Sequence, residues 1–197
     1  MLDLERRAAR MLGATSSLTL RTLGRSQPRD TVRMALAVRM SAAVLDVRDR
    51  VRSAAAKQFS RATGLDTEPS GTVDTVSADR AGNAVARAWY RGGGGRSTGG
   101  GSSDSWDATT ARDAATSKIA RVAAYEVADA WNDEHRRNAE VWPDYRFVER
   151  WCAILDTHLC IRCRRMNGRR ADAHGQFAEG WPPLHGDCRC VVITTVA

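Results

Sequence analysis

The residues of this chain that are best suited to chemistry are its cysteines, which gather in the last quarter. They are residues 152, 160, 163, 188 and 190 of 197. Cys160 and Cys163 have the C-x2-C spacing, at which a tight turn directs two sulfurs at one ion about 2.3 Å away. His185, Cys188 and Cys190 form an H-x2-C-x-C group that brings three more ligands. Four of these five side chains would close a tetrahedral zinc site, and the choice among the last three stays open.

Other chemistry fits the cysteines less well. An odd number of cysteines in a chain without a recognisable export signal argues against a disulfide framework. A thioredoxin-like redox pair belongs beside a βαβ pattern and would leave the H-x2-C-x-C group unexplained. A free buried thiol is plausible for Cys152, which stands alone beside Trp151. The spacing therefore favours a structural zinc ion over redox chemistry.

The sequence contains no recognisable catalytic set. A zinc deaminase places H-x-E before P-C-x-x-C, whereas His135 is followed by two arginines and Pro182-Pro183 precedes His185. The H-E-x-x-H motif is also missing, and the G-x-S-x-G spacing occurs at Gly95-Ser97-Gly99, inside a glycine-rich stretch with no strand predicted before it. A zinc ion with four protein ligands has no open position for water, so we expect no enzymatic activity.

Arginines crowd the cysteine cluster in the sequence. They are Arg162, Arg164, Arg165, Arg169, Arg170 and Arg189. Three or four thiolates around Zn²⁺ leave a net negative charge, so guanidinium groups nearby would stabilise the site. Nucleic-acid contact and simple solvation are the alternatives. His158 and His174 have no partner at ligand spacing, and we expect both at the surface.

Positive charge is concentrated near the start of the chain. Lysines and arginines number 30 against 23 acidic residues, and 28 of the 30 are arginine. Residues 1–64 hold 13 basic and 5 acidic groups, whereas residues 106–197 hold 13 of each. Such asymmetry indicates a polyanionic partner, nucleic acid or an acidic protein, although a solvated helix face is the commoner cause. The arginines that we expect to make this contact are Arg33, Arg39, Arg48, Arg50 and Arg52.

Hydrophobic periodicity predicts a mainly helical scaffold. Residues 2–24 predict one or two short helices. Apolar residues at spacings of three and four then predict a long helix over 31–62. The same periodicity predicts helices over about 76–89, despite Gly82, and over about 111–137.

A glycine-rich stretch, residues 91–105, divides these elements. It has no apolar side chain and cannot bury surface to offset the entropy of ordering, which predicts a flexible linker. It also lacks the Lys-Ser or Lys-Thr pair and the preceding strand of a phosphate-binding loop. We expect a basic helical region over 1–90 and a small α+β domain over 106–197, with strands in 145–155 and 190–196. The fold class is thus α+β and mainly helical, closed by a zinc-knuckle-like Cys/His cluster.

The sequence predicts no membrane insertion. Arg39 and Asp46 interrupt the longest apolar stretches, which fall far short of the roughly 18 residues needed to cross a bilayer. Asp3 and Glu5 stand where the apolar part of a secretory signal would begin, so we expect no such signal. No membrane partner and no small-molecule substrate are expected.

The C-terminal residues resemble a known signature. In order they are Trp151, Asp156, Cys160, Cys163 and Gly168, then Pro182-Pro183-Leu184-His185 and Cys188-Arg189-Cys190. This order resembles the pattern W-x4-D-x3-C-x2-C-x4-G followed by P-P-x-H-x2-C-R-C of the phage Mu F-like minor head proteins, also called phage head morphogenesis proteins. The resemblance covers about residues 111–196, including the helix before the motif, and says little about residues 1–105.

The sequence departs from that family pattern at two turns. Met166-Asn167 replaces the usual Leu-Asp, and Gly186-Asp187 replaces the usual Pro-Asn, both compatible with a turn. The resemblance implies a non-enzymatic virion protein, located at the capsid interior or portal vertex and in the host cytoplasm during assembly. Portal and capsid proteins would be its partners, and packaged double-stranded DNA is a further candidate. The alternative function is a zinc-containing DNA-binding or nuclease-like toxin module.

Overall fold

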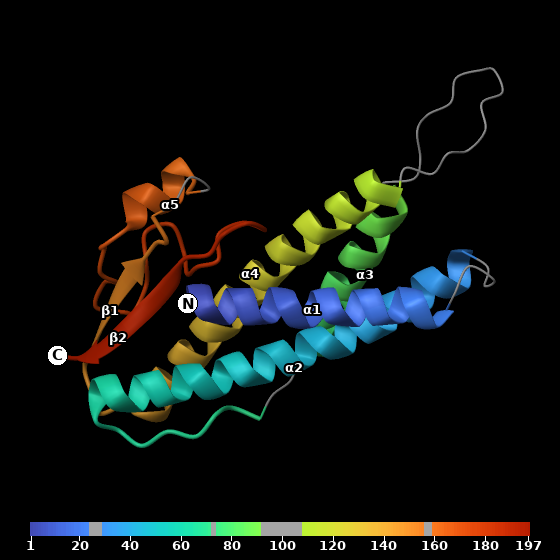
Figure 1. Cartoon of the computed structure of the whole chain (residues 1–197). Helices are drawn as coiled ribbons and strands as arrows, with labels where there is room; N and C mark the ends of the chain where they lie inside the picture. The colour runs from blue at the N-terminus through green and yellow to red at the C-terminus, as the bar shows by residue number, and fades with distance from the viewer. Residues whose placement is uncertain (24–28, 72–73, 92–107, 156–158) are drawn as a thin grey trace. The chain divides into compact units, whose positions relative to one another are not determined.

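The computed structural model describes residues 1–23, 29–71, 74–91, 108–155 and 159–197. Its helices are α1 (Leu2–Leu23), α2 (Arg29–Thr63), α3 (Thr75–Arg91), α4 (Ala108–Val141) and α5 (Ile161–Met166), and its strands are β1 (Phe147–Cys152) and β2 (Val191–Val196) (Figure 1). This part of the chain is mainly helical, with one two-stranded antiparallel sheet, which confirms the expected α+β class. No helix in it is long and apolar enough to span a membrane.

The elements follow the sequence pattern, with three differences. α1 is a single helix, and α4 extends past the predicted 111–137 at both ends. The C-x2-C pair lies at the start of the short helix α5 rather than in a turn alone. Nearly all of the predicted linker 91–105 falls outside the described residues, so its flexibility stays a prediction.

Contacts divide the chain into two compact units. The unit with the cysteines, called the cluster unit, comprises Met1–Glu5, Asp46–Val73 and Ala124–Ala197. The other, called the helical unit, comprises Arg6–Leu45 and Asp74–Ala123. Each unit draws on residues from both sides of 91–105, so this grouping differs from the linear division into 1–90 and 106–197. The long helices α2 and α4 each contribute residues to both units.

The helical unit has an apolar core in which α3 lies against α2. Leu12, Leu36, Met40 and Val85 are fully buried there. Gly82 is the point of closest approach, because an added Cβ would lie 2.6 Å from the Ala37 carbonyl oxygen and 2.8 Å from the Ser41 nitrogen. Gly82 therefore weakens α3 locally but permits the helix crossing.

We expect Gly82→Ala to destabilise the helical unit by about 1–3 kcal/mol, because the new methyl group meets backbone atoms that have little room to move. Gly13→Ala in α1 is the matched control, since an added Cβ at Gly13 has no atom within 4 Å. That control should be neutral or stabilising by up to about 1 kcal/mol through helix propensity. Urea denaturation followed by circular dichroism measures both. Equal effects of the two variants would contradict the close crossing.

A buried ion-pair network joins α2 to α4 within the cluster unit. The guanidinium of Arg48, 1% exposed, lies 2.6 Å from Glu126 Oε2 and 2.8 Å from Asp129 Oδ2. Asp133 adds a third carboxylate at 3.8 Å. Burial alone would lower the pKa of Arg48, but the attraction of Glu126 and Asp129 outweighs it and the pKa is raised. Arg48 therefore stays charged and clamps the two helices together.

Arg52 is also buried, one helical turn after Arg48 in α2. Within the described residues its Nε and Nη2 atoms have no hydrogen-bond partner. Burial, together with the neighbouring charges of Arg48 and Arg137, lowers the pKa of Arg52. The expected contact with nucleic acid or an acidic partner is therefore wrong for Arg48 and Arg52, because neither side chain is at the surface.

The other three arginines of the expected basic surface are exposed. Arg33 pairs with Asp30 at 3.3 Å, and Arg50 pairs with Asp46 at 3.1 Å, both within α2. Arg39 has no ion pair among the described residues. Two of the three remaining charges are thus partly neutralised by carboxylates of the same helix.

Replacing Arg48 by Met should destabilise the cluster unit by roughly 3–5 kcal/mol, because the carboxylates of Glu126 and Asp129 would lose their buried counter-charge. Arg50→Met is the matched control in the same helix. The Arg50 side chain is 66% exposed, so its loss should cost under about 1 kcal/mol. Thermal denaturation compares the two variants. Adding Glu126→Gln to Arg48→Met should recover part of the loss, and a purely additive double variant would contradict the pairing.

Candidate metal centre

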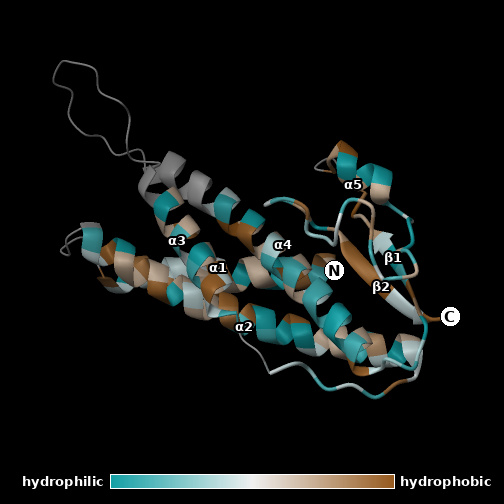
Figure 2. Cartoon of the chain, turned by 180° about the vertical axis from the view of Figure 1, so that it is seen from behind, coloured by the Kyte–Doolittle hydropathy of each residue, from teal (hydrophilic) through white to brown (hydrophobic). Residues whose placement is uncertain are grey.

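The helix α4 fixes the start of β2, directly after Cys190. The side-chain amide of Asn132 donates to the Cys190 carbonyl at 2.9 Å and accepts from the Val192 N–H at 2.8 Å. The Trp131 indole N–H donates to the Val192 carbonyl at 3.3 Å. These bonds satisfy the free edge of β2 as a neighbouring strand would. Figure 2 shows the first half of β2, next to this anchor, as hydrophobic, and the strand ends on a further apolar residue, Val196.

The other edge of the sheet holds the segment that follows the C-x2-C pair. The Gly168 N–H donates to the Trp151 carbonyl, and the Trp151 N–H donates to the Arg169 carbonyl, both at 2.8 Å. The Ala171 N–H donates to the Glu149 carbonyl at 3.0 Å. β1 lies between this segment and β2, because Trp151 is also the register partner of Val192. The two ligand-bearing loops are therefore attached to one small sheet.

A small apolar core lies beneath the two loops. The fully or nearly fully buried side chains of this core are Trp151, Cys163, Met166, Phe177, Cys188, Cys190 and Val192. Trp151 and Phe177 pack edge to face, with ring centroids 5.4 Å apart. Three of the five predicted ligands are thus part of the core, while Cys160 and His185 are only half-buried.

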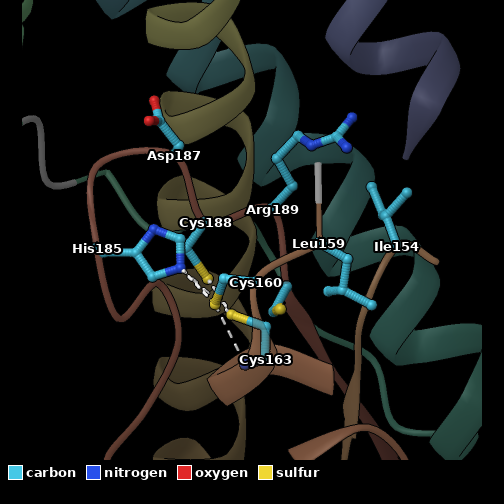
Figure 3. A pocket seen from close by; sticks show the side chains of 9 residues that line it. Ile154, Leu159, Cys160, Cys163, His185, Asp187, Cys188 and Arg189 are labelled. Carbon is cyan, nitrogen blue, oxygen red and sulfur yellow. Dashed lines mark hydrogen bonds between the residues drawn. The ribbon is translucent and has the colours of Figure 1, made fainter. Parts of the chain in front are cut away.

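The structure places all five predicted ligands around one cavity, and Figure 3 labels four of them, Cys160, Cys163, His185 and Cys188. The His185 Nε2 atom lies 3.1 Å from the Cys160 sulfur and 3.4 Å from the Cys163 sulfur. The Cys163 and Cys188 sulfurs are 3.6 Å apart. Ligands on one tetrahedral zinc ion are separated by about 3.5–3.8 Å, given metal–ligand bonds of about 2.0–2.3 Å. Cys163 also belongs to a second close group, with Cys188 and Cys190.

Hydrogen bonds among the ligands distribute their charge unevenly. The Cys190 side chain and backbone donate to the Cys188 sulfur, which lowers the pKa of Cys188 to about 5, while donating that bond raises the pKa of Cys190. The Cys163 N–H caps α5 by donating to the Cys160 sulfur and lowers the pKa of Cys160. Burial raises the pKa of Cys163 to about 12. Cys160 and Cys188 are thus the thiolates that the protein itself stabilises.

Charged side chains connect the cluster to other segments of its unit. Arg189, which stands between two of the ligands, pairs with Glu5 at the start of α1 at 3.4 Å. Arg162 in α5 pairs with Glu179 at 2.8 Å, and this contact raises the pKa of Arg162. Arg189 lines the cavity beside the cysteines, together with Ile154 and Leu159 (Figure 3). These ion pairs connect the segments that carry the cluster to the start of α1 and to Glu179. The cluster itself could hold a metal ion.

His135 is a buried residue whose environment the sequence reasoning did not foresee. It stacks on Trp131 with ring centroids 5.2 Å apart, and it meets Phe59 edge to face at 5.8 Å. Its Nδ1 lies 3.3 Å from the Thr194 hydroxyl oxygen. Burial lowers the pKa of His135 to about 4, so the ring is neutral near pH 7. His135 belongs to the packing of α4 on the sheet and lies outside the ligand cluster.

The remaining candidates fall where the sequence predicted, as far as they are described. Cys152 is a half-buried free thiol at the end of β1 and belongs to neither ligand group. His174 is exposed. His158 lies outside the described residues, as does Asp156 of the signature. Comparisons of the chain with protein-family models, with curated proteins and with solved structures give no match.

The buried carboxyl of Glu149 should make the cluster unit less stable as the pH rises. Glu149 is 8% exposed on β1, and burial raises its pKa from 4.5 to about 7. A group whose pKa is higher in the folded state than in the unfolded state stabilises the fold at pH values below its unfolded-state pKa. That contribution is lost as the pH rises through the folded-state pKa. We expect the free energy of unfolding of Glu149→Gln to exceed that of the parent by up to about 3 kcal/mol at pH 8. This difference should vanish near pH 4.5.

Glu140→Gln, at an exposed position of α4, is the control for this comparison. Each variant is compared with the parent by urea denaturation at the same pH. The pH-dependent contributions of His135 and the cysteines to stability are then the same in both and cancel in the difference. A constant difference between Glu149→Gln and the parent from pH 5 to pH 8 would contradict the raised pKa of Glu149.

Proposed function

We propose that the cluster holds one structural zinc ion through Cys160, Cys163, His185 and Cys188. Thiolate and imidazole are the donors that zinc prefers over oxygen-seeking ions such as Mg²⁺. The separations of 3.4 Å and 3.6 Å lie close to the edges of a zinc tetrahedron, the separation of 3.1 Å is shorter, and the three contacts connect all four side chains in one chain. Cys190 is the alternative fourth ligand, and in this assignment it donates a hydrogen bond to Cys188.

The protein that carries this zinc site is, in our proposal, a non-enzymatic minor head protein of a tailed phage or prophage-like particle. The observation that supports it is the role of the signature residues in the structure. Trp151 fills the core, and Gly168 takes a φ of 78° in the segment bonded to β1. Pro182 is buried, and the ligands form two close groups that share Cys163. In this proposal the described signature residues serve to build a small folded module.

In this function the zinc-stapled module is an anchor on portal or capsid protein. A site closed by four protein ligands offers no water for hydrolysis, so zinc contributes stability and not chemistry. The nuclease-like toxin alternative makes the opposite prediction. It requires cleavage of plasmid DNA by the purified chain when Mg²⁺ or Zn²⁺ is added.

Metal analysis of the purified chain should find about one zinc per chain. Cys160→Ser should lose the zinc and unfold the module, because a small core depends on such a cross-link. Cys152→Ser is the matched control, a free thiol near the cluster that should retain zinc and stability. Cys188→Ser should resemble Cys160→Ser, whereas Cys190→Ser should keep the zinc. Full zinc content in Cys160→Ser would refute the site, and loss in Cys190→Ser alone would reassign the fourth ligand.

The particle role is tested with the tagged full-length chain, because α2 and α4 are joined by buried ion pairs and a C-terminal fragment would lack Arg48. We expect the tagged chain to copurify with heads, and Cys160→Ser to be absent from them while Cys152→Ser is retained. Blotting of gradient-purified particles measures incorporation. A chain that is absent from particles, or that cleaves plasmid DNA, would refute the head-protein function.

A further inference from the structure

Two pairs of arginines flank one tight turn in the cluster unit. Arg164 and Arg165 lie in the last turn of α5, and Arg169 and Arg170 come after its last residue, Met166, and two intervening residues. We call residues 164–170 the arginine turn. The surrounding stretch, residues 159–171, contains five arginines and no acidic residue.

The backbone geometry brings these arginines into one small area. The Arg169 N–H donates to the Met166 carbonyl at 2.9 Å. Asn167 has φ −56° and ψ 127°, and Gly168 has φ 78°, which are the angles of a type II turn. Such a turn places its first and last Cα atoms within about 7 Å of each other. Arg170 also forms an antiparallel bridge with Arg150 on β1, which adds a fifth guanidinium to this area.

The charges of the arginine turn are exposed and uncompensated within the described part of the chain. All four of its arginine side chains are exposed, because α5 turns Cys163 and Met166 inward. None of the four forms an ion pair with a described residue. The neighbouring Arg162, by contrast, pairs with Glu179. Gathering like charges without partners costs free energy, so an anionic partner would gain by neutralising them.

We infer that the arginine turn binds the phosphate backbone of duplex DNA. Each guanidinium offers a planar fork of N–H donors that matches phosphate oxygens, and several neighbouring arginines can neutralise several phosphates of one duplex. A protein partner would call for an apolar or aromatic anchor, and within the arginine turn Met166 is buried and Asn167 and Gly168 supply none. The nearest exposed apolar side chain on α5 is Ile161, at its other end. This surface replaces the buried Arg48 and Arg52 as the site of polyanion contact, and it stands independently of the head-protein function.

The test compares two variants of the full chain that lose equal charge. The turn variant replaces Arg164, Arg165, Arg169 and Arg170 by Gln. The control replaces four exposed arginines of α1 and α2 by Gln, namely Arg6, Arg10, Arg21 and Arg39. Binding to a labelled short duplex of mixed sequence is measured by fluorescence anisotropy over a series of NaCl concentrations.

The parent should bind without sequence preference and lose affinity steeply as salt rises. The turn variant should lose at least about tenfold in affinity, and its slope of log K against log salt should fall by up to about 3.6, at about 0.9 per lost phosphate contact. The control should keep most of the affinity and the slope. Far-UV circular dichroism and metal content check that both variants fold. If the turn variant misfolds, the paired replacements Arg164/Arg169 and Arg165/Arg170 should each remove about half of the slope.

Four results would overturn the inference. One is an equal loss of DNA affinity in the turn variant and the control, which would mean that net charge alone drives binding. A second is a loss confined to the control, which would assign the contact to α1 and α2. A third is the lack of DNA binding by the parent at low salt. The fourth is stronger binding of the parent to polyglutamate than to the duplex, which would make the turn a surface for an acidic protein.

Discussion

β1 and β2 share six residue pairs, and an isolated pair of strands of that length is at best marginally stable in water. The sheet therefore depends on groups that close its edges and its loops. Asn132 and Trp131 of α4 occupy one edge, and residues 168–171 occupy the other. The Cys/His cluster joins the loops that leave those edges. A metal ion bound there would fix both loops at one point. The same metal–ligand bonds would then determine both the stability of the module and the geometry of the site.

The arginines of this chain perform two opposite tasks. Arg48 is buried and surrounded by carboxylates, and its ion pairs hold α2 against α4. Arg164 and Arg170 remain in water without acidic partners among the described residues, which makes them available to an anion. The same side chain serves both tasks because the guanidinium stays charged in either environment. Net charge alone therefore overstates the basic surface of the N-terminal helices.

In the structure, the signature residues behave as parts of a fold. Gly168 turns the chain back toward β1, and Trp151 packs on Phe177 beneath the sulfurs. The Cys/His side chains of the cluster contact one another directly, His185 with Cys160 and Cys163 with Cys188. The arginine turn is the surface through which we propose that this module contacts DNA.

Short-range patterns in the sequence were enough to predict α2, both strands and the five Cys/His side chains that cluster, because helical periodicity and metal-ligand spacing are local properties. The burial of Arg48 also had a sequence signal, since it stands four residues after Val44 on the apolar stripe of α2. The ion-pair role of Arg48 could be recognised only in the tertiary structure, because the carboxylates that neutralise it lie about 80 residues further along the chain, in α4. Asn132 at the edge of β2 had no comparable signal. An amide that replaces a missing strand can be recognised only when the edge it satisfies has been placed beside it.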